Sequence, residues 1–437
     1  MTAILDLDTA VASGRAPIKA RIATASLIGT TLEWYDFAIY NTLAALVFGK
    51  IFFPSVDPLA GIIFAFSTYA VGYVSRPLGG FVLGRLGDRI GRQSVLVLTL
   101  VLMGLTTALM GLLPTYASIG VWSPILLVAL RFVQGVAIGG EWAGAVLLAM
   151  EHGDPRKRGL NASWTQVGPS FGILIGTGFI ALVTALVSPD DFLDWGWRVP
   201  FALSLLLVAF GLWVRRGVGE TPAFKQLSES HSIVKSPITE VLRDHWRRLL
   251  VAGGVRMGVG VVYGLAVVFS LTYITTTLEL SRTLALTAVM IGTVFNALAV
   301  PLFGALSDRF GRRPVYAAGA IAGVIWAFAF FNLLDSRQPV LIVVAVVIGL
   351  VIHAAMYGPQ AAFVTEQFPT RVRYAGSSLA YTLAGVASDA FAPLIIVSLF
   401  KATQTSAAIS LYVCAALGVT LLALFCARET AKRPLED

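Results

Sequence analysis

The chain has 437 residues, of which 57% are hydrophobic and only 13% are charged, and its mean hydropathy is +0.80. This composition excludes an ordinary soluble globular protein and indicates a membrane protein with many spans. A formal charge of +8 would suggest a nucleic-acid partner in a soluble chain. Here the basic residues follow membrane topology instead, so we expect no nucleic acid as a partner.

Twelve hydrophobic segments are long enough to cross a bilayer as helices. In the first half of the chain they lie near residues 22–48, 58–84, 93–113, 122–150, 159–187 and 197–214. In the second half they lie near residues 247–277, 283–306, 314–334, 339–364, 372–399 and 406–427. The sequence therefore predicts an all-α membrane protein with twelve transmembrane helices.

The basic residues indicate how these spans are oriented. The termini and even-numbered loops hold 24 Lys or Arg residues, whereas the odd-numbered loops hold five. By the positive-inside rule, both termini are expected in the cytoplasm. The predicted division is a cytoplasmic N-terminus (1–21), a six-helix bundle (22–214), a cytoplasmic linker (215–246), a second six-helix bundle (247–427) and a cytoplasmic C-terminus (428–437).

An internal repeat relates the two halves. The loop after the second span reads GRLGDRIGRQ from Gly84, and the loop after the eighth reads GALSDRFGRR from Gly304. Six of the ten positions match at an offset of 220 residues. Two six-helix halves in parallel repeat are a recurrent transporter architecture.

These loops resemble the signature loop of the major facilitator superfamily. The segments Glu33-Trp-Tyr-Asp36-Phe, Arg76-Pro-Leu-Gly-Gly, Arg131 to Glu141 and Trp195 to Phe201 resemble its metabolite:proton symporter branch. The resemblance implies two pseudo-symmetric six-helix bundles that rock about a central site while substrate and proton move together. One departure is Gln93, where the loop motif usually ends in Arg or Lys.

The first span carries two carboxylates, Glu33 and Asp36, that need cationic partners in a membrane. By helical rise, Arg131 lies roughly 13 Å from the outer end of the fourth span. Asp36 lies about 21 Å from the cytoplasmic end of the first span, so the two residues are at comparable depth in the membrane. We expect Asp36 and Arg131 to form the proton-coupling pair, with Glu33 as a possible substitute for Asp36. Arg76 and Glu141 also match in depth and are expected to form a structural or gating pair.

The remaining polar residues within the spans suit a small carboxylate substrate, because Arg binds it through two hydrogen bonds and Tyr and Gln bind its oxygens. Arg256 is a lone mid-helix arginine, and Asp389 is its expected resting partner. Arg256 and His353 resemble positions in the shikimate-transporting members. The candidate substrate-binding residues are Arg131, Arg256, Tyr40, Gln134, Gln166, Tyr263, His353, Tyr357, Gln360, Asn296 and Tyr381.

Charged residues in the cytoplasmic loops can form ion pairs that hold that side shut. The candidate gating residues are Asp88, Arg89, Arg92, Asp308, Arg309, Arg312, Glu151 and Glu366, together with Arg76 and Glu141. We expect Glu151 to pair with Arg158 and Glu366 with Arg371. Glycines at four-residue spacing, Gly135/Gly139 and Gly168/Gly172/Gly176, predict close helix packing.

The sequence predicts a monomeric, multi-pass symporter of a bacterial inner membrane that imports a small organic acid anion such as a shikimate-like, aromatic, dicarboxylic or tricarboxylic acid. The proton is the expected coupling ion, and no cofactor or metal is expected. The alternatives are a proton symporter of a betaine- or proline-like zwitterion, or a nutrient receptor with the same fold. An enzyme is disfavoured because no catalytic constellation is visible.

Overall fold

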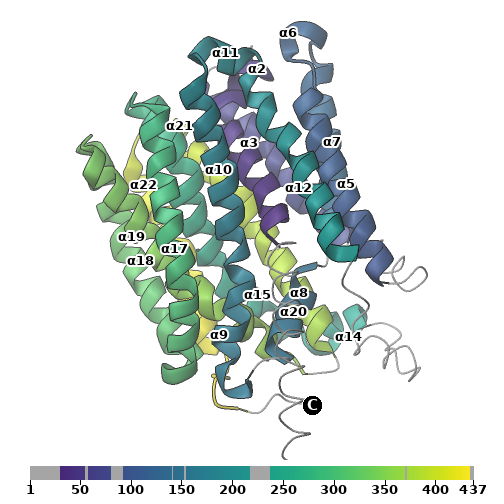
Figure 1. Ribbon diagram of the computed structural model, residues 1–437. Coiled ribbons are helices and arrows are strands. Elements are labelled where there is room, and N and C mark those ends of the chain that lie inside the picture. The colour runs from purple at the N-terminus through teal and green to yellow at the C-terminus, as the bar shows by residue number, and fades with distance from the viewer. Residues whose placement is uncertain are drawn as a thin grey trace, which may run out of the picture.

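The computed structural model describes residues 30–54, 58–79, 92–139, 141–151, 154–216, 237–369 and 372–433. Within these ranges, nine helices are long and apolar enough to cross a membrane, and Val97–Leu112 and Trp122–Ile138 are shorter apolar helices. Residues 30–51 add the helical part of the first predicted span. Together these helices form the predicted all-α membrane protein with twelve transmembrane helices. Figure 1 shows how they are arranged.

Apolar sequence in a bilayer must satisfy its backbone groups internally, and helices do so. After helical residues 30–43, the first half consists of η1 (Ala44–Phe48), α2 (Gly49–Ile51), α3 (Pro58–Val74), α5 (Arg92–Leu112), α6 (Tyr116–Ile119), α7 (Trp122–Ile138), α8 (Glu141–Glu151), η2 (Pro155–Lys157), α9 (Arg158–Ser163), η3 (Trp164–Gln166), α10 (Gly168–Leu186), α11 (Pro189–Asp194), η4 (Gly196–Arg198) and α12 (Val199–Arg216).

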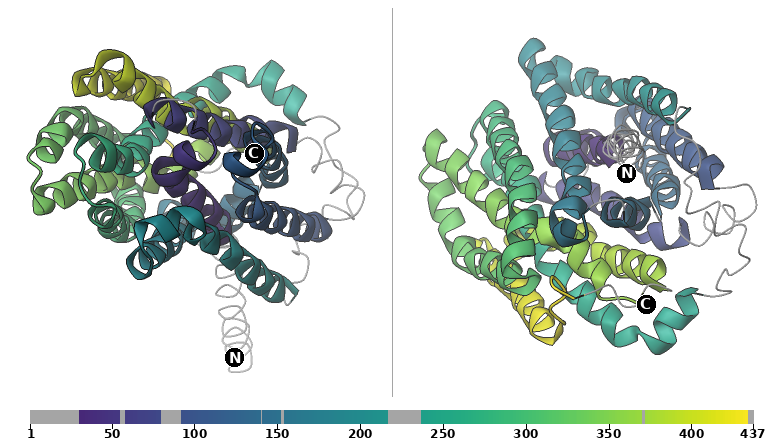
Figure 2. Two further views of the ribbon diagram at one scale, coloured as in Figure 1. Left: turned by 90° about the horizontal axis from the view of Figure 1, so that it is seen from above. Right: turned by 60° about the horizontal axis from the view of Figure 1, so that its bottom comes forward.

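The second half follows the same order of spans. It consists of α14 (Pro237–Asp244), α15 (Trp246–Tyr263), η5 (Gly264–Phe269), α16 (Ser270–Thr272), η6 (Tyr273–Thr277), α17 (Arg282–Phe310), α18 (Arg312–Asp335), α19 (Pro339–Glu366), α20 (Arg373–Gly385), η8 (Val386–Ala390), α21 (Phe391–Thr403) and α22 (Ser406–Cys426). Helices α5 and α18 lie on opposite sides of the molecule (Figure 1), and Figure 2 gives the same arrangement from two other directions.

Stretches of π-helix occupy equivalent positions in the two halves. Ala44–Phe48 lies in the first span and Gly264–Phe269 in the seventh, and their first residues are separated by the same 220 positions as the repeated loops. At this offset Asp36 is the counterpart of Arg256. Another π-helical stretch, Val386–Ala390, contains Asp389. Such turns occur frequently at functional sites.

The two halves contact each other toward both ends of the spans. At one end α3 packs against α21. At the other end α9 packs against α17 and α19, and α8 packs against α20. Helix α10 lies along α17 (Figure 1). Polar side chains in the middle of the bundle are therefore enclosed by helices from both halves.

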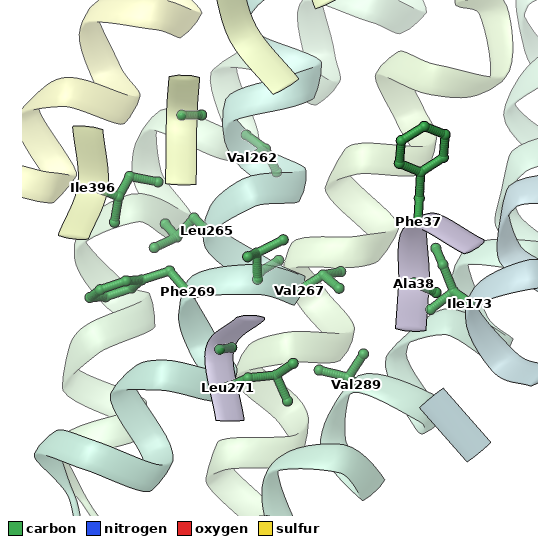
Figure 3. Packing of buried hydrophobic residues seen from close by; sticks show 14 of the residues in the cluster. Phe37, Ala38, Ile173, Val262, Leu265, Val267, Phe269, Leu271, Val289 and Ile396 are labelled. Atoms are coloured by element: carbon green, nitrogen blue, oxygen red, sulfur yellow. The ribbon is translucent and has the colours of Figure 1, made fainter. Parts of the chain in front are cut away.

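Close packing of the first span explains how its polar face is positioned. Figure 3 shows Ala38 of the first span beside Ile173 of α10. A Cβ atom at Gly172 would lie 2.6 Å from the carbonyl oxygen of Thr31, so only glycine allows this approach. A Cβ atom at Gly135 would lie 1.9 Å from the carbonyl oxygen of Gly72. The predicted close packing at these two glycines is confirmed.

Gly135→Ala should lower the thermal unfolding temperature of the purified protein. The new methyl group collides with the backbone of α3, and such overpacking typically costs about 1–3 kcal/mol. Gly418→Ala is the matched control, because a Cβ atom there meets nothing within 4 Å. Since alanine forms helices better than glycine, the control should be unchanged or slightly stabilised. Equal melting temperatures for the two variants would contradict the packing of α7 on α3.

Candidate functional site

A chain of hydrogen bonds links Asp36 to Arg131 in the first half. Thr107 of α5 donates to Asp36 Oδ2 at 2.8 Å, and Gln134 Nε2 donates to Thr107 Oγ1 at 2.7 Å. Arg131 Nη1 donates to Gln134 Oε1. None of the four residues is more than 3% exposed. The expected direct pair of Asp36 with Arg131 is therefore replaced by a connection through two neutral side chains, which occupy the space between α7 and the first span.

Arg131 is held mainly by an aromatic ring. Its guanidinium carbon lies 3.5 Å from the centroid of the Tyr40 ring, and the Tyr40 hydroxyl shares a hydrogen bond with Thr68. No carboxylate in the described part of the chain lies within ion-pair distance of Arg131. A guanidinium has five N–H donors, so Arg131 retains the capacity to bind an anion.

Glu33 pairs with Arg76 instead of with Arg131. Their closest charged atoms are 3.8 Å apart. The Arg76 guanidinium also lies over the rings of Tyr73 and Phe37, at 4.0 and 4.6 Å from their centroids. The partner expected for Arg76 was Glu141, whose side chain lies outside the described part of the structure. In this structure Arg76 thus stabilises an acid of the first span.

Arg256 and Asp389 form the ion pair expected from the sequence. The distance between Arg256 Nη2 and Asp389 Oδ2 is 2.5 Å. Arg256 Nη1 donates to the Tyr381 carbonyl at 3.0 Å, and its guanidinium lies 3.7 Å from the centroid of the Tyr381 ring. The π-helical stretch η8, which contains Asp389, packs against α3 of the first half. The pair therefore lies at the boundary with the first half.

Tyr381 connects this pair to the first half through stacking. Its ring lies parallel to that of Trp142 in α8, with centroids 3.7 Å apart and planes inclined by 12°. The Trp142 indole donates to Gln166 Oε1 at 3.0 Å. Trp142 was not among the predicted site residues, although its position next to the predicted Glu141 was a signal.

A second contact between the halves runs through Asn296 of α17. Ser170 of α10 donates to Asn296 Oδ1 at 3.1 Å, while Asn296 Nδ2 donates to the Leu350 carbonyl at 2.7 Å and contacts His353 Nδ1 at 3.0 Å. The amide of Asn296 is thus fully engaged in joining helices. The His353 ring lies next to that of Tyr357, with centroids 4.8 Å apart.

Five predicted binding residues, namely Arg131, Gln166, Arg256, Tyr357 and Gln360, carry buried polar atoms with no hydrogen-bond partner among the described residues. Gln360, with 0% exposure, has neither its amide oxygen nor its amide nitrogen bonded, and the Nε2 atom of Gln166 is likewise unbonded. Buried polar groups are normally satisfied, so such atoms suit a polar ligand. Tyr263 lies nearby, 5.8 Å from the His353 ring and 6.1 Å from the Trp34 ring of the first span.

The charges described in the middle of the bundle are balanced. The three carboxylates are Glu33, Asp36 and Asp389, and the three guanidinium groups are Arg76, Arg131 and Arg256. An ionised group in a membrane interior costs several kcal/mol unless it is paired or hydrogen-bonded. Each of the carboxylates meets this condition through an arginine or through Thr107.

A separate charged cluster joins the halves beside α9. Asp308 accepts hydrogen bonds from the backbone N–H groups of Gly159 and Leu160, at 2.8 and 2.9 Å. Arg312 lies 2.7 Å from Asp308 and 3.3 Å from Glu366. Asp308, Arg312 and Glu366 are therefore positioned as the gating prediction requires, although their role in gating stays a prediction.

The other residues predicted to take part in gating either have partners different from those expected or lie outside the described part of the chain. Glu366 lies 3.0 Å from Arg158, the residue expected to pair with Glu151. Arg309 is exposed and lies over the Phe310 ring. Several of the named residues, or their side chains, lie outside the described part of the chain, namely Asp88, Arg89, Arg92, Glu141, Glu151 and Arg371.

The segment after α22 completes this cluster, and the sequence did not predict its part. Glu429 accepts hydrogen bonds from the backbone N–H groups of Arg312 and Arg313, each at 2.9 Å, and from those of Thr430 and Ala431, each at 3.0 Å. Partial burial raises the pKa of the Glu429 carboxyl, but these four N–H donors outweigh it and hold the pKa below the ordinary value of 4.5. Glu429 thereby caps the start of α18.

The same segment also binds the first half. Arg158 Nη2 donates to the carbonyl oxygens of Thr430, Ala431 and Arg433, at 3.1, 3.3 and 2.9 Å. The hydroxyl of Thr430 donates to Glu366 Oε2 at 2.5 Å. Residues 428–433 therefore connect α9 of the first half to α18 and α19 of the second.

Comparison with known proteins gives consistent matches. Residues 22–244 match the family model for sugar and other transporters, and residues 255–437 match that for the major facilitator superfamily. The inner membrane metabolite transport protein YhjE of Escherichia coli is 38% identical over 426 residues, covering 96% of this chain and 97% of that protein. The shikimate transporter of E. coli is 38% identical over 382 residues, covering 87% of each chain.

Two further comparisons bear on substrate class and fold. A proline/betaine transporter of Salmonella typhimurium is 35% identical over 425 residues, covering 94% of this chain and 84% of that protein. Among solved structures, a partially occluded inward-open form of the xylose transporter XylE from E. coli has a TM-score of 0.75 at 20% identity, covering 95% of this chain and 99% of that one. At that identity, the likeness concerns the fold alone.

Glu429→Gln should lower the melting temperature at pH 7, because a neutral amide holds the four N–H groups and the start of α18 less strongly than a carboxylate. The pKa of Glu429 is lower in the folded protein, so its stabilising effect is present above pH 4.5 and is lost as the pH falls below it. Melting curves of both proteins between pH 7 and pH 3 should therefore converge on acidification. A constant difference over this range would contradict the capping role.

Proposed function

Because the chain belongs to the major facilitator superfamily, we propose that it is a proton-coupled symporter that imports a small organic acid anion by alternating access. At the coarser level it is a membrane transporter of metabolites and not an enzyme. The proposal rests mainly on one observation. Arg131 is buried, contacts no described acid, and is linked through hydrogen bonds to the buried carboxyl group of Asp36.

Asp36 is the proposed proton carrier. Asp36 is 3% exposed, and its carboxyl group lacks an ion-pair partner in the described part of the chain, so burial opposes its ionised form. The positive charge of Arg131, which is linked to Asp36 through Gln134 and Thr107, favours that ionised form. When an anionic substrate neutralises Arg131, this support weakens and Asp36 takes up a proton. Substrate and proton binding would thus favour each other. Glu33 is the weaker candidate, since Arg76 already pairs with it.

The proposed substrate carries at least one carboxylate. Arg131 offers N–H donors, and Gln360 offers an amide whose two polar atoms lack described partners. The rings of Tyr40 and Tyr381 lie against the guanidinium groups of Arg131 and Arg256, and the ring of Tyr263 lies beside that of His353. The shikimate transporter among the relatives supports an acid substrate.

Arg256 is also a proposed contact of the substrate, but it would have to leave its partner Asp389 first. Asp389 occupies its guanidinium in this structure, so a substrate carboxylate would compete with Asp389 for it. The same pair also favours a second candidate function. A zwitterion could bind Arg131 through its carboxylate and Asp389 through its cationic group, and the proline/betaine transporter among the relatives supports this alternative.

We further propose that the protein acts as a monomer in a bacterial inner membrane, with both termini in the cytoplasm. The inner membrane protein among the relatives supports the location. The distribution of basic residues between the loops supports the orientation. The charged cluster of Asp308, Arg312 and Glu366 would then lie on the cytoplasmic side and hold that side closed.

Asp36→Asn should abolish uptake driven by a pH gradient in proteoliposomes but preserve exchange of substrate between the internal and external pools. Asparagine keeps the size of the side chain but cannot take up and release a proton. Arg131→Ala should lose both activities, because it removes the contact with the substrate as well. Full gradient-driven accumulation by Asp36→Asn would move the proton-carrying role to Glu33 or away from the first span.

Arg256→Ala should weaken binding of the best organic acid by about ten- to a hundredfold, since a charge-assisted hydrogen bond contributes roughly 1.5–3 kcal/mol. Arg256→Lys should restore only part of the affinity, because the ammonium group lacks the planar fork. Thermal-shift titration with aromatic, alicyclic and dicarboxylic acids and with betaines identifies the best ligand and measures its affinity.

The double variant Arg256→Ala/Asp389→Asn tests whether the loss of affinity in Arg256→Ala comes from a lost contact with the substrate or from leaving Asp389 without its partner. If Arg256 contacts the substrate, the double variant stays as weak as Arg256→Ala. Recovery of affinity in the double variant would show that Arg256 serves only to neutralise Asp389. Betaine binding that needs Asp389 would favour the zwitterion alternative.

A further inference from the structure

Thr107 has two acceptors within reach of its single hydroxyl hydrogen. Its Oγ1 atom lies 2.8 Å from Asp36 Oδ2 and 2.9 Å from the carbonyl oxygen of Met103, four residues earlier in α5. On its other side the same oxygen accepts a hydrogen bond from Gln134 Nε2 at 2.7 Å. Thr107 is 1% exposed, so these groups are its immediate surroundings.

We propose that Thr107 is a hydroxyl switch that lets Asp36 gain and lose a proton without breaking its connection to Gln134 and Arg131. This inference rests on the proposed role of Asp36 as the proton carrier. It adds a positioning residue on α5 to a site otherwise built from the first span and α7.

In the ionised state, the Thr107 hydroxyl donates to the Asp36 carboxylate. When a proton from the aqueous phase binds Asp36 Oδ2, the new carboxylic acid donates to Thr107 Oγ1. The threonine hydrogen then turns to the Met103 carbonyl. A hydroxyl has one donor and two acceptor sites, so in both states Thr107 also accepts from Gln134. Both states keep the hydrogen bonds that join Thr107 to Asp36 and to Gln134, and no heavy atom has to move between them.

The switch would keep the position of Arg131 independent of the proton on Asp36. Gln134 stays bonded to Thr107 in both states, and its Oε1 atom keeps accepting from Arg131. The described charged groups that act on Asp36 are Arg131 and, on its own helix, Glu33. Arg131 thus keeps its position in both states, and the proton on Asp36 acts on an anion bound there through charge alone.

A neighbouring residue provides a matched control. Thr106 is also buried in α5, and its hydroxyl donates to the backbone carbonyls of Leu102 and Met103 at 2.8 and 2.9 Å. It makes the same kind of bond within the helix as Thr107 but has no contact with Asp36. Thr106→Val and Thr107→Val therefore each remove one buried hydroxyl from α5, but only Thr107→Val removes the contacts with Asp36 and Gln134.

The test is pH-difference infrared spectroscopy of the purified full-length protein in lipid vesicles. The carbonyl band of a protonated carboxylic acid that disappears in Asp36→Asn belongs to Asp36. In Thr107→Val this band should shift to higher frequency, because the acid has lost its hydrogen-bond acceptor. Thr107→Ser should retain the wild-type frequency, and so should Thr106→Val. An unchanged band in Thr107→Val, or the same shift in Thr106→Val, would overturn the switch.

A transport measurement separates this inference from the proposed function. With labelled shikimate as the probe, Thr107→Val should lose most of the accumulation driven by a pH gradient and keep exchange, while Thr107→Ser recovers accumulation. A band that depends on Thr107 without coupled uptake of any tested acid would reject the symport proposal and leave the switch intact. Absence of any band that depends on Asp36 would overturn both.

Discussion

The constraint on which this structure depends is the cost of placing charge inside an apolar helix bundle. Ionised side chains in a membrane persist only where they are paired or hydrogen-bonded. Glu33 is held by Arg76, and Asp389 by Arg256. Asp36 differs from both, because its described support is a neutral hydroxyl. It is therefore the carboxylate whose charge state is least fixed by its surroundings.

The internal repeat places opposite charges at equivalent positions. Asp36 and Arg256 are separated by the same 220 residues as the repeated loops, and each lies shortly before a π-helical stretch. The acid of one half and the arginine of the other therefore occupy corresponding positions in the two bundles. The partners of the two buried groups differ, since Thr107 bonds Asp36 in the first half and Asp389 pairs with Arg256 in the second. Two copies of one architecture thus carry different chemistry.

The spans could be predicted because hydrophobicity alone determines which segments cross a membrane. Depth along each helix correctly placed Asp36 near Arg131, but depth does not reveal what lies between two helices. Thr107 escaped prediction because a threonine within a helix usually bonds only its own backbone. Arg76 was matched to Glu141 by depth, yet its position two residues after the end of α3 brings it to Glu33.

The charged cluster beside α9 likewise contains residues that the sequence predicted and one that it did not. Asp308 and Arg312 were recognisable from the repeated loop, since the motif occurs twice. Glu429 was not, because it follows the last span in a short polar segment that carries no repeat or periodic pattern. Its role emerges only when the chain brings residues 428–433 back to the start of α18. Contacts of this kind depend on tertiary packing and leave no local trace.

Among the side chains that the structure describes, the balance of three carboxylates and three arginines in the middle of the bundle has a consequence for energetics. Moving one elementary charge across a membrane potential of 100 mV changes its free energy by about 2.3 kcal/mol. A monovalent anion carried together with one proton adds no net charge to a neutral site. The loaded and empty forms would then respond equally to voltage. Such a carrier takes its driving force from the difference in pH across the membrane and from the substrate gradient, and it continues to work when the membrane is depolarised.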